Sequence, residues 1–295
     1  MPTSNTARVL PQPKVHSAVA ARVAPASPIV KWVGGKTRLL SQLVPLLPAG
    51  SELMRHVEPF FGGGALFFAR RPKRALLCDV NPSLVATYEA VRDSLDEVIA
   101  HLSRLSAAHK AERYYEVRHR YNHAQRLDKV ERAAMFVYLN KTCFNGLHRV
   151  NRRGEFNVPA GRYDKPRILD EELLRAANGV LQQAELRCAS FEQVLTAAKP
   201  GDFVYFDPPY EPVSSTASFT AYSQGGFGRA DQERLRDVFA QLDRRRCKLM
   251  LSNSDVPFIR DLYAKFRIDV IAAPRAINCD GKKRGLVSEV VVRNY

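Results

Sequence analysis

Short apolar runs alternate with longer amphipathic stretches from Ile29 onward, and this alternation limits the possible folds more than any other feature of the chain. Strands are expected at residues 55–59, 74–78, 184–188, 203–206, 248–252 and 266–272. Helices are expected after Gly64, Pro82, Phe191, Ala230 and Val256. Such an order predicts βαβ units, in which helices cover a mainly parallel sheet, and hence an α/β fold. A last Val-rich run at residues 286–293 is expected to join this sheet antiparallel at an edge.

A long insertion separates the second expected strand from the third. Residues 79–183 are too many for one crossover helix, and residues 94–139 repeat apolar side chains at helical spacing. The sequence therefore predicts a sheet domain made of residues 28–93 and 171–295, with an inserted, mainly helical domain at residues 94–170. Residues 1–27 are rich in Ala and Pro and hold no acidic residue. They are expected to form a disordered tail, although a transit peptide has a similar composition.

The charge balance points to a partner. The 295 residues include 45 Lys and Arg against 30 Asp and Glu, a formal net charge of +15. Such an excess indicates a polyanion, most often nucleic acid, although a merely basic soluble protein would show it too. No run reaches the roughly 18 apolar residues of a membrane helix. The five cysteines form no CxxC pair, so we expect reduced thiols in a cytoplasmic protein and no metal site.

Glycines follow the first expected strand in the segment Glu58–Phe68, and Asp79 ends the second. Glycine lets the backbone approach a ligand at the carboxyl edge of the sheet, where α/β folds bind nucleotides. A packing turn or a dehydrogenase would also place glycines there, although the spacing is not GxGxxG. The Asp79 carboxylate is placed to accept both hydroxyls of a ribose, and a cap on the next helix is the alternative.

The segment that points most directly to a reaction is Asp207-Pro208-Pro209-Tyr210, which follows the apolar strand at residues 203–206. The two prolines remove backbone donors and stiffen the turn. Asp207 and the Pro208 carbonyl can accept both N–H bonds of an amino group on a planar ring, and Tyr210 can stack on that ring. The sequence therefore predicts a substrate that is an aromatic ring bearing an amino group.

These segments, with Lys31-Trp32-Val33-Gly34-Gly35-Lys36, resemble the Dam-type DNA adenine-N6 methyltransferases of the D12 class. The insert carries the closest similarity, at residues 140–149, 153–159 and 161–163, and the loop Ser218–Tyr222 is similar too. The resemblance implies a Rossmann-like sheet that binds S-adenosyl-L-methionine. It also implies base flipping of adenine out of double-stranded DNA and direct in-line transfer of the methyl group to N6, with no covalent enzyme intermediate.

The resemblance also assigns the cofactor and catalytic residues. The catalytic residues are Asp207, Pro208, Pro209 and Tyr210. The residues expected beside S-adenosyl-L-methionine are Trp32, Lys36, Phe60, Gly62, Gly64, Asp79, Phe191 and Asp207. Two alternatives stay open, because Lys36 could be a surface lysine and Phe191 a core phenylalanine.

The DNA contacts are expected mainly in residues 140–167, which include seven Lys and Arg but only two acidic residues. By resemblance, Phe144 and Asn145 enter the gap left by the flipped base, with Phe144 where the family often has tyrosine. Lys31 and Arg149 resemble the family's guanine readers, and Leu147 and Pro159 its contacts to a thymine methyl, which together predict the site GATC. Further DNA contacts are expected from Lys141, Asn151, Arg153 and Arg162. Among other basic runs, Arg244–Arg246 is expected to be a solvated helix end, whereas residues 282–284 could meet DNA.

Two alternatives to a Dam-type enzyme remain at this point. One is the modification enzyme of a restriction system with another recognition site. The other is a DNA-binding relative that has lost catalysis, or an oxidoreductase on a similar sheet. The intact Asp207–Tyr210 motif argues against lost activity, and the basic insert argues against a metabolic dehydrogenase. A monomer suffices for the chemistry, so no obligate protein partner is expected. The enzyme is expected to be encoded by a bacterium or a phage and to act at the bacterial nucleoid.

Overall fold

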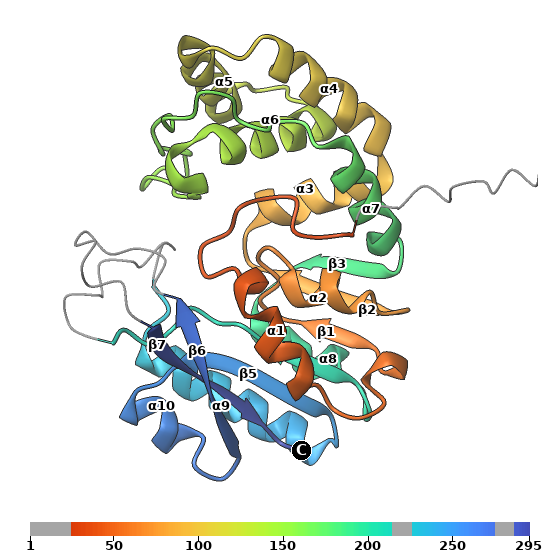
Figure 1. Ribbon diagram of the computed structural model, residues 1–295, viewed down its shortest axis with the longest axis vertical. Coiled ribbons are helices and arrows are strands. Elements are labelled where there is room, and N and C mark those ends of the chain that lie inside the picture. The colour runs from red at the N-terminus through yellow and green to blue at the C-terminus, as the bar shows by residue number, and fades with distance from the viewer. Residues whose placement is uncertain (1–24, 214–225, 275–285) are drawn as a thin grey trace, which may run out of the picture.

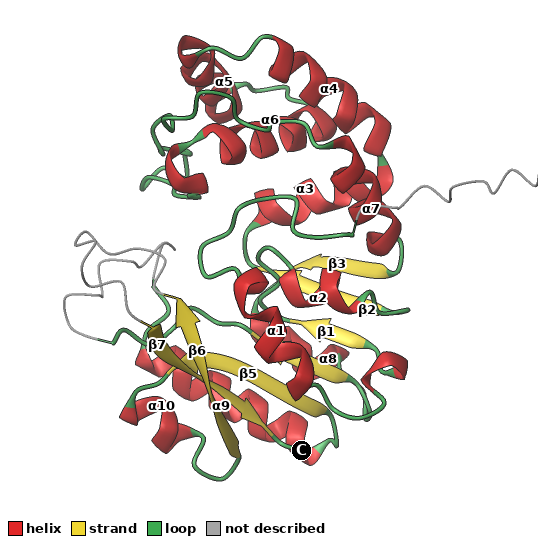
Figure 2. Ribbon diagram, in the orientation of Figure 1, coloured by secondary structure: helices red, strands yellow, loops and turns green. Residues whose placement is uncertain are grey.

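The computed structural model describes residues 25–213, 226–274 and 286–295. Its strands form one seven-stranded sheet, in the order β3-β2-β1-β4-β5-β7-β6 (Figure 2). The strand bounds are β1 His56–Glu58, β2 Ala75–Asp79, β3 Ala184–Cys188, β4 Phe203–Phe206, β5 Lys248–Ser254, β6 Arg267–Pro274 and β7 Leu286–Arg293. Strands β3, β2, β1, β4 and β5 are parallel, which confirms the predicted arrangement.

The expected position of the last strand is wrong in one respect. Strand β7 is antiparallel to its neighbours, as expected, but it lies between β5 and β6 and leaves β6 at the edge. Val290, Val291 and Val292 are all fully buried, as suits a strand covered on both faces. Strand β6 instead exposes Val270, and the Gln42 side chain donates to the Ala272 carbonyl and accepts from the Ala272 amide. A side chain thus satisfies part of an edge that could otherwise pair with another chain.

Helices cover both faces of the sheet (Figure 1). The α-helices are α1 Leu40–Leu43, α2 Ala65–Arg70, α3 Pro82–Asp93, α4 Leu95–Ala107, α5 Ala111–His123, α6 Lys129–Thr142, α7 Glu171–Leu181, α8 Val194–Ala197, α9 Arg229–Arg244 and α10 Pro257–Leu262. Short 3-10 helices lie at Lys36–Leu39, Val44–Leu46, Ser51–Leu53, Phe144–Gly146 and Phe191–Gln193. Alternate residues of β4 face opposite layers: Phe203 packs in a cluster with α1, and Val204 in a cluster with α9.

Helices α4, α5 and α6 lie together beyond the β3 end of the sheet (Figure 1). They do not have a separate core, because one apolar cluster runs from Leu77 of β2 through Tyr88 of α3 to Val98 of α4 and Phe136 of α6. The expected domain boundaries fall at helix ends, since α3 ends at Asp93 and α7 begins at Glu171. The helical content of residues 94–139 is confirmed, and the division into two domains stays a prediction.

Candidate active site

The site is built where the carboxyl ends of neighbouring parallel strands meet. Strand β1 ends at Glu58, β2 ends at Asp79, and Asp207 directly follows β4. Because β1 lies between β2 and β4, these three carboxylates come to one edge of the sheet. This is the edge at which open α/β sheets bind their ligands.

Lys36 connects the segment Lys31–Lys36 to the Asp207–Tyr210 motif. Its ammonium Nζ lies 2.7 Å from Asp207 Oδ1, 2.6 Å from the Gly34 carbonyl oxygen that accepts its hydrogen bond, and 4.7 Å from the centre of the Tyr210 ring. The Lys36 side chain is 5% exposed, so the alternative of a surface lysine is wrong. Burial raises the pKa of Asp207, and the nearby Lys36 charge opposes that rise. Lys36 and the Asp207–Tyr210 motif therefore lie together, and their expected contacts with the cofactor stay predictions.

The proline carbonyls of the motif differ in their contacts. The Pro209 carbonyl accepts a hydrogen bond of 2.9 Å from Gln232 Nε2, a side chain of α9 with no exposed surface. No donor to the Pro208 carbonyl is found within residues 25–213, 226–274 and 286–295. Among the residues that the structure describes, the motif therefore has an unused acceptor next to the Asp207 carboxylate, while Gln232 of α9 holds the turn.

Glu289 of β7 is a site residue that the sequence reasoning missed. Its Oε2 accepts a hydrogen bond of 2.9 Å from the Tyr210 hydroxyl. Burial raises the pKa of Glu289, and burial together with the Asp207 and Glu289 carboxylates raises the pKa of Tyr210. The Tyr210 ring is therefore held between Lys36 on its face and Glu289 at its hydroxyl. No local signal announces this contact, which joins residues 79 positions apart.

A second buried pair lies behind Asp207, again unforeseen. Glu58 and His56 are 2% and 0% exposed, and His56 Nε2 lies 2.7 Å from Glu58 Oε1. Arg70 of α2 contacts His56 Nδ1 and, as a guanidinium, can only donate there. His56 therefore donates from Nε2 to Glu58, in agreement with burial, which lowers the pKa of His56. Burial and the Asp207 charge raise the pKa of Glu58.

The glycine turn is tightly packed against Trp32. Gly62 and Gly64 adopt positive φ angles of 49° and 67°. A Cβ on Gly62 would lie 2.8 Å from Trp32 Cδ1, and one on Gly64 would lie 2.2 Å from the Phe61 ring. Packing alone therefore requires glycine at both positions, as the packing-turn alternative stated. The same packing places Trp32 at the turn, and its expected contact with the cofactor stays a prediction.

Asp79 holds the turn together but does not cap the next helix. Its Oδ2 accepts from the Gly62 amide and its Oδ1 from the Asn81 amide, both at 2.9 Å. Asn81 is the residue that caps α3, since its side-chain oxygen accepts from the amides of Ser83 and Leu84. The capping alternative for Asp79 is wrong. Burial raises the pKa of Asp79, and the hydrogen bonds from Asn81 and Gly62 oppose that rise.

Phe191 and Phe60 form an aromatic cluster at the same edge. Their rings stack with centroids 5.3 Å apart, and Phe227 packs against both. Phe191 is 5% exposed, which favours the core role that was left open for it. Val80, next to Asp79, is 65% exposed and is the better candidate for covering a planar ring. The sequence reasoning missed Val80, although an apolar residue directly after such a carboxylate is a readable signal.

The expected DNA contacts gather on an irregular arm made of residues 143–160, which we call the recognition arm. Isolated antiparallel bridges pair Cys143 with Ala160 and Val150 with Phe156, and the Phe144 amide donates to the Pro159 carbonyl at 2.9 Å. Phe144 is 49% exposed at the bend, next to Asn145 with a positive φ of 54°. The arm thus brings together five of the predicted DNA contacts: Phe144, Asn145, Leu147, Arg149 and Pro159.

The other predicted DNA contacts lie in more varied surroundings. Arg153 and Arg162 are exposed, but Asn151 is used within the turn, where its oxygen accepts from the amides of Arg153 and Glu155. Lys141 is half-buried, and burial lowers its pKa. Lys31 is exposed beside Tyr163, a residue that was not predicted: its Nζ donates to the Tyr163 hydroxyl at 3.1 Å and lies 4.4 Å from the ring centre. The DNA roles of all these residues stay predictions.

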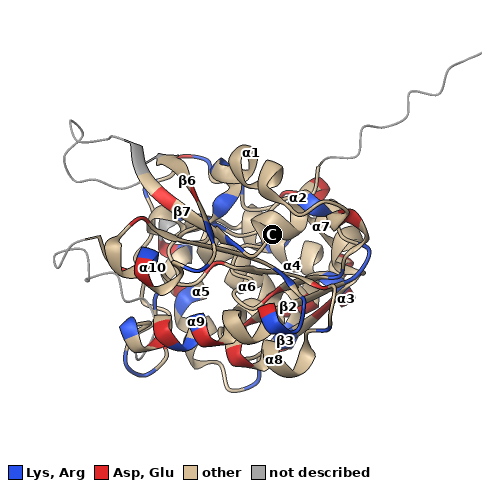
Figure 3. Cartoon of the chain, turned by 90° about the horizontal axis from the view of Figure 1, so that it is seen from below, with Lys and Arg blue, Asp and Glu red and all other residues tan. Residues whose placement is uncertain are grey.

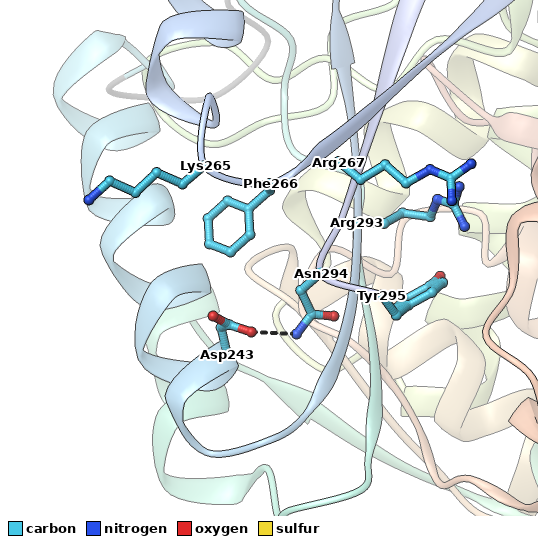
Figure 4. A pocket seen from close by; sticks show the side chains of 7 residues that line it. All are labelled: Asp243, Lys265, Phe266, Arg267, Arg293, Asn294 and Tyr295. Atoms are coloured by element: carbon cyan, nitrogen blue, oxygen red, sulfur yellow. Dashed lines mark hydrogen bonds between the residues drawn. The ribbon is translucent and has the colours of Figure 1, made fainter.

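Within the described residues, the opposite edge of the sheet carries no comparable arrangement. A cavity of about 320 Å³ there is lined by Asp243, Lys265, Phe266, Arg267, Arg293, Asn294 and Tyr295 (Figure 4). Several of its polar groups already have partners: Asn294 Nδ2 donates to Asp243 Oδ1 at 2.8 Å, and Arg293 Nη2 lies 2.6 Å from Asp269 Oδ2. Arg244–Arg246 is exposed at the end of α9, as expected, and Arg is interspersed with Asp and Glu along that helix (Figure 3).

Comparison with known proteins decides the family. A model described as D12 class N6 adenine-specific DNA methyltransferase matches residues 32–277. The chain belongs to this family. It is 41% identical over 285 residues to the Type II methyltransferase M.MjaIII of Methanocaldococcus jannaschii, covering 91% of this chain and 99% of that protein. It is 41% identical over 273 residues to the Type II methyltransferase M1.LlaDCHI of Lactococcus lactis, covering 91% and 95%. To the DNA adenine methylase of Escherichia coli it is 37% identical over 264 residues, covering 89% and 93%.

The D12 methyltransferase is thus an adenine-specific DNA methyltransferase, with the Rossmann-like α/β fold that the resemblance implied, and the oxidoreductase alternative is excluded. Membership also implies S-adenosyl-L-methionine as the methyl donor. Within the described part of the chain, no helix has the length and apolar character needed to cross a membrane. Most of the expected tail, the loop Ser218–Tyr222 and the basic residues 282–284 lie outside the described residues.

Proposed function

We propose that this D12 methyltransferase transfers a methyl group from S-adenosyl-L-methionine to N6 of adenine in double-stranded DNA, at GATC, after flipping the base. The observation that carries the proposal is the Asp207–Tyr210 turn, presented beside the glycine turn and Asp79 at one edge of the sheet. We further propose that it works as a monomer, with residues 94–170 as the DNA-recognition domain.

The residues at this edge fit the cofactor. A carboxylate offers about four acceptor positions, and Asp79 uses two of them for Gly62 and Asn81, which leaves acceptors for ribose hydroxyls. Asp207, paired with Lys36, and Glu289, bonded to Tyr210, place carboxyl groups at this edge for a cationic donor. When bound, the cofactor supplies a methyl group activated by its sulfonium. Trp32, the glycine turn, Asp79 and the exposed Val80 are the residues that would hold it.

The motif residues act on the adenine amine. Its lone pair is delocalised into the ring, so N6 is a weak nucleophile. Asp207 and the free Pro208 carbonyl accept its two N–H bonds, which favours a more tetrahedral nitrogen with a localised lone pair. N6 would then form a bond to the methyl carbon as the sulfur–methyl bond breaks with its electron pair returning to sulfur, and one N6 proton would leave along its hydrogen bond to Asp207. Positioning supplies much of the acceleration. No nucleophilic side chain takes part.

The flipped base must be held against the cost of leaving the helix. Extruding a base costs a few kcal/mol, and stacking on one aromatic ring returns about 1–3 kcal/mol. Tyr210 is fixed for that purpose by Lys36 and Glu289. The exposed Phe144 at the bend of the recognition arm would fill the gap left in the duplex.

The proposed site GATC depends on the recognition arm. Arg149 is exposed there, and its Nε donates to Asn157 Oδ1 at 2.8 Å, which orients the guanidinium. An oriented guanidinium can pair with both acceptors of guanine in the major groove. Lys31, fixed by Tyr163, provides a second cation, and Leu147 and Pro159 provide apolar contacts to a thymine methyl.

The test incubates the protein with radiolabelled S-adenosyl-L-methionine and plasmid DNA, then digests the plasmid with GATC nucleases that differ in sensitivity to methylation. We expect labelled DNA that resists the nuclease blocked by adenine methylation. Labelled DNA that is still cut at GATC would favour a modification enzyme with another site, a role that the names of the 41% identical Type II relatives support. No label would refute methyl transfer, and the variant Asp207→Ala provides the inactive control.

A further inference from the structure

His148 is the residue of the recognition arm that reaches the cofactor edge. It lies between Leu147 and Arg149, both predicted DNA contacts, yet its own ring points into the protein. The ring stacks on Trp32 with centroids 5.6 Å apart and planes at 25°. Phe136 and Phe156 pack against its other sides, at 5.4 and 5.8 Å.

A hydrogen bond orients the His148 ring. Its Nδ1 lies 3.3 Å from Asn81 Nδ2. The Asn81 oxygen is already used to cap α3, so its amide nitrogen is the donor and His148 Nδ1 the acceptor. Burial lowers the pKa of His148 to about 4, so the ring is neutral near pH 7 and can accept this bond.

Two partners of His148, Trp32 and Asn81, contact other residues that are proposed to hold the cofactor. Trp32 packs on the glycine turn so closely that a Cβ on Gly62 would lie 2.8 Å from its Cδ1. The backbone amide of Asn81 donates to Asp79 Oδ1 at 2.9 Å. Moving the arm would therefore disturb the ring on the glycine turn and the carboxylate that faces the ribose.

A buried asparagine makes a second connection at the base of the arm. Asn140 is 2% exposed and accepts from the Lys31 amide at 2.7 Å. Its side-chain nitrogen donates to the Lys31 carbonyl at 2.8 Å and to the Gly146 carbonyl at 3.1 Å. The segment before Trp32 is thus fixed to the arm by backbone contacts, and His148 adds the contact to the ring itself.

We propose that His148 is a positioning residue that couples DNA recognition to cofactor binding. This inference rests on the proposed function and deepens it. DNA held on Leu147 and Arg149 keeps His148 against Trp32 and Asn81, which favours the arrangement that binds the cofactor. By linkage, the bound cofactor raises the affinity for DNA by the same factor.

Trp32 provides the measurement, because it is the single tryptophan of the chain. Its fluorescence is followed while S-adenosyl-L-homocysteine is added, with and without a duplex that the wild type methylates. Equilibrium dialysis of labelled S-adenosyl-L-homocysteine checks the affinities independently. We expect DNA to tighten cofactor binding at least about fivefold, the lower end of typical couplings. His148→Ala should reduce this ratio to near one, and His148→Phe, which keeps a ring without the acceptor, should give an intermediate ratio.

His109 offers a matched control in the same insert. Its Nδ1 is 2.8 Å from the Tyr138 hydroxyl and its ring packs on Tyr138, away from the cofactor edge. His109→Ala should keep the wild-type ratio. If His148→Ala does not fold, as judged by circular dichroism, His148→Phe decides.

A wild-type ratio near one would overturn the coupling, as would equal ratios for the His148 variants and wild type. A reduced ratio in His109→Ala equal to that of the His148 variants would overturn it too, because the effect would then be a general loss of rigidity. A wild-type protein that transfers no methyl group would instead refute the proposed function. The two failures are distinguishable because methyl transfer is measured before the ratio.

Discussion

Replacing Glu289 tests how far the position of the Tyr210 ring depends on the hydrogen bond that its hydroxyl donates. Glu289→Ala removes the only carboxylate within hydrogen-bonding distance of that hydroxyl in the described part of the chain, at 2.9 Å, and leaves a buried phenol without its acceptor. We expect the variant to bind DNA with nearly wild-type affinity, because Glu289 lies on β7 and not on the recognition arm. We expect methyl transfer to slow, because the ring that is proposed to stack on the flipped base is no longer fixed.

The size of the loss follows from the bond. A hydrogen bond to a charged group is worth about 1.5–3 kcal/mol, which corresponds to a decrease of about 10- to 150-fold in kcat/KM. Glu289→Gln keeps a neutral oxygen acceptor, worth about 0.5–1.5 kcal/mol, so it loses only the difference of about 1–1.5 kcal/mol, a decrease of about 5- to 13-fold. The order wild type, Gln, Ala is the expected signature of a positioning hydrogen bond.

The assay measures kcat and KM with labelled S-adenosyl-L-methionine and a short duplex, at one pH at which all variants are folded. Glu185→Ala is the control, because Glu185 is an exposed residue of β3 paired with Arg187. Wild-type kcat/KM in Glu289→Ala would refute the reasoning. So would equal losses in the Ala and Gln variants, since a bond-specific effect must distinguish them.

Three further predictions concern other residues of the site. Asp207→Ala should abolish methyl transfer while leaving DNA affinity largely intact in a filter-binding assay, and near-normal turnover would remove Asp207 from the mechanism. Arg149→Ala should lower the free-energy discrimination against a wrong base at one base pair by about 1–3 kcal/mol. An unchanged preference across single-base variants of the site would contradict its role. Burial raises the pKa of Glu58, so the wild type should lose stability as pH rises through that raised value, whereas Glu58→Gln should not. Urea unfolding should therefore show a larger gain for Glu58→Gln at pH 8 than at pH 5, and an equal gain at both pH values would argue against a buried charge at this position.

The strands and helices could be predicted because their signals are local. The apolar runs at residues 184–188 and 203–206 coincide with β3 and β4, and Pro82 begins α3 directly after its Asn81 cap. The order of strands is different, because pairing joins segments far apart in the chain. The Val-rich run at residues 286–293 identified a strand, but three consecutive buried valines could also have indicated a position inside the sheet.

The site shows the same limit. Asp207–Tyr210 could be found because all its residues are adjacent and follow an apolar strand. Glu289 could not, since its role depends on β7 lying beside β5, which brings it to the hydroxyl of Tyr210. His148 could not be separated from its neighbours in the recognition arm, because only the structure shows that Leu147 and Arg149 flank a ring that faces Trp32.

The insertion of β7 between β5 and β6 has a consequence for biosynthesis. A ribosome makes β6 before β7, yet within the sheet β6 pairs only with β7. In a nascent chain that has not yet released residues 286–293, β6 therefore has no strand to pair with, and one edge of β5 stays unpaired. The acceptor for the Tyr210 hydroxyl arrives on the same strand that pairs with this edge. Pairing of β7 in the sheet and completion of the candidate site around Tyr210 are thus a single event.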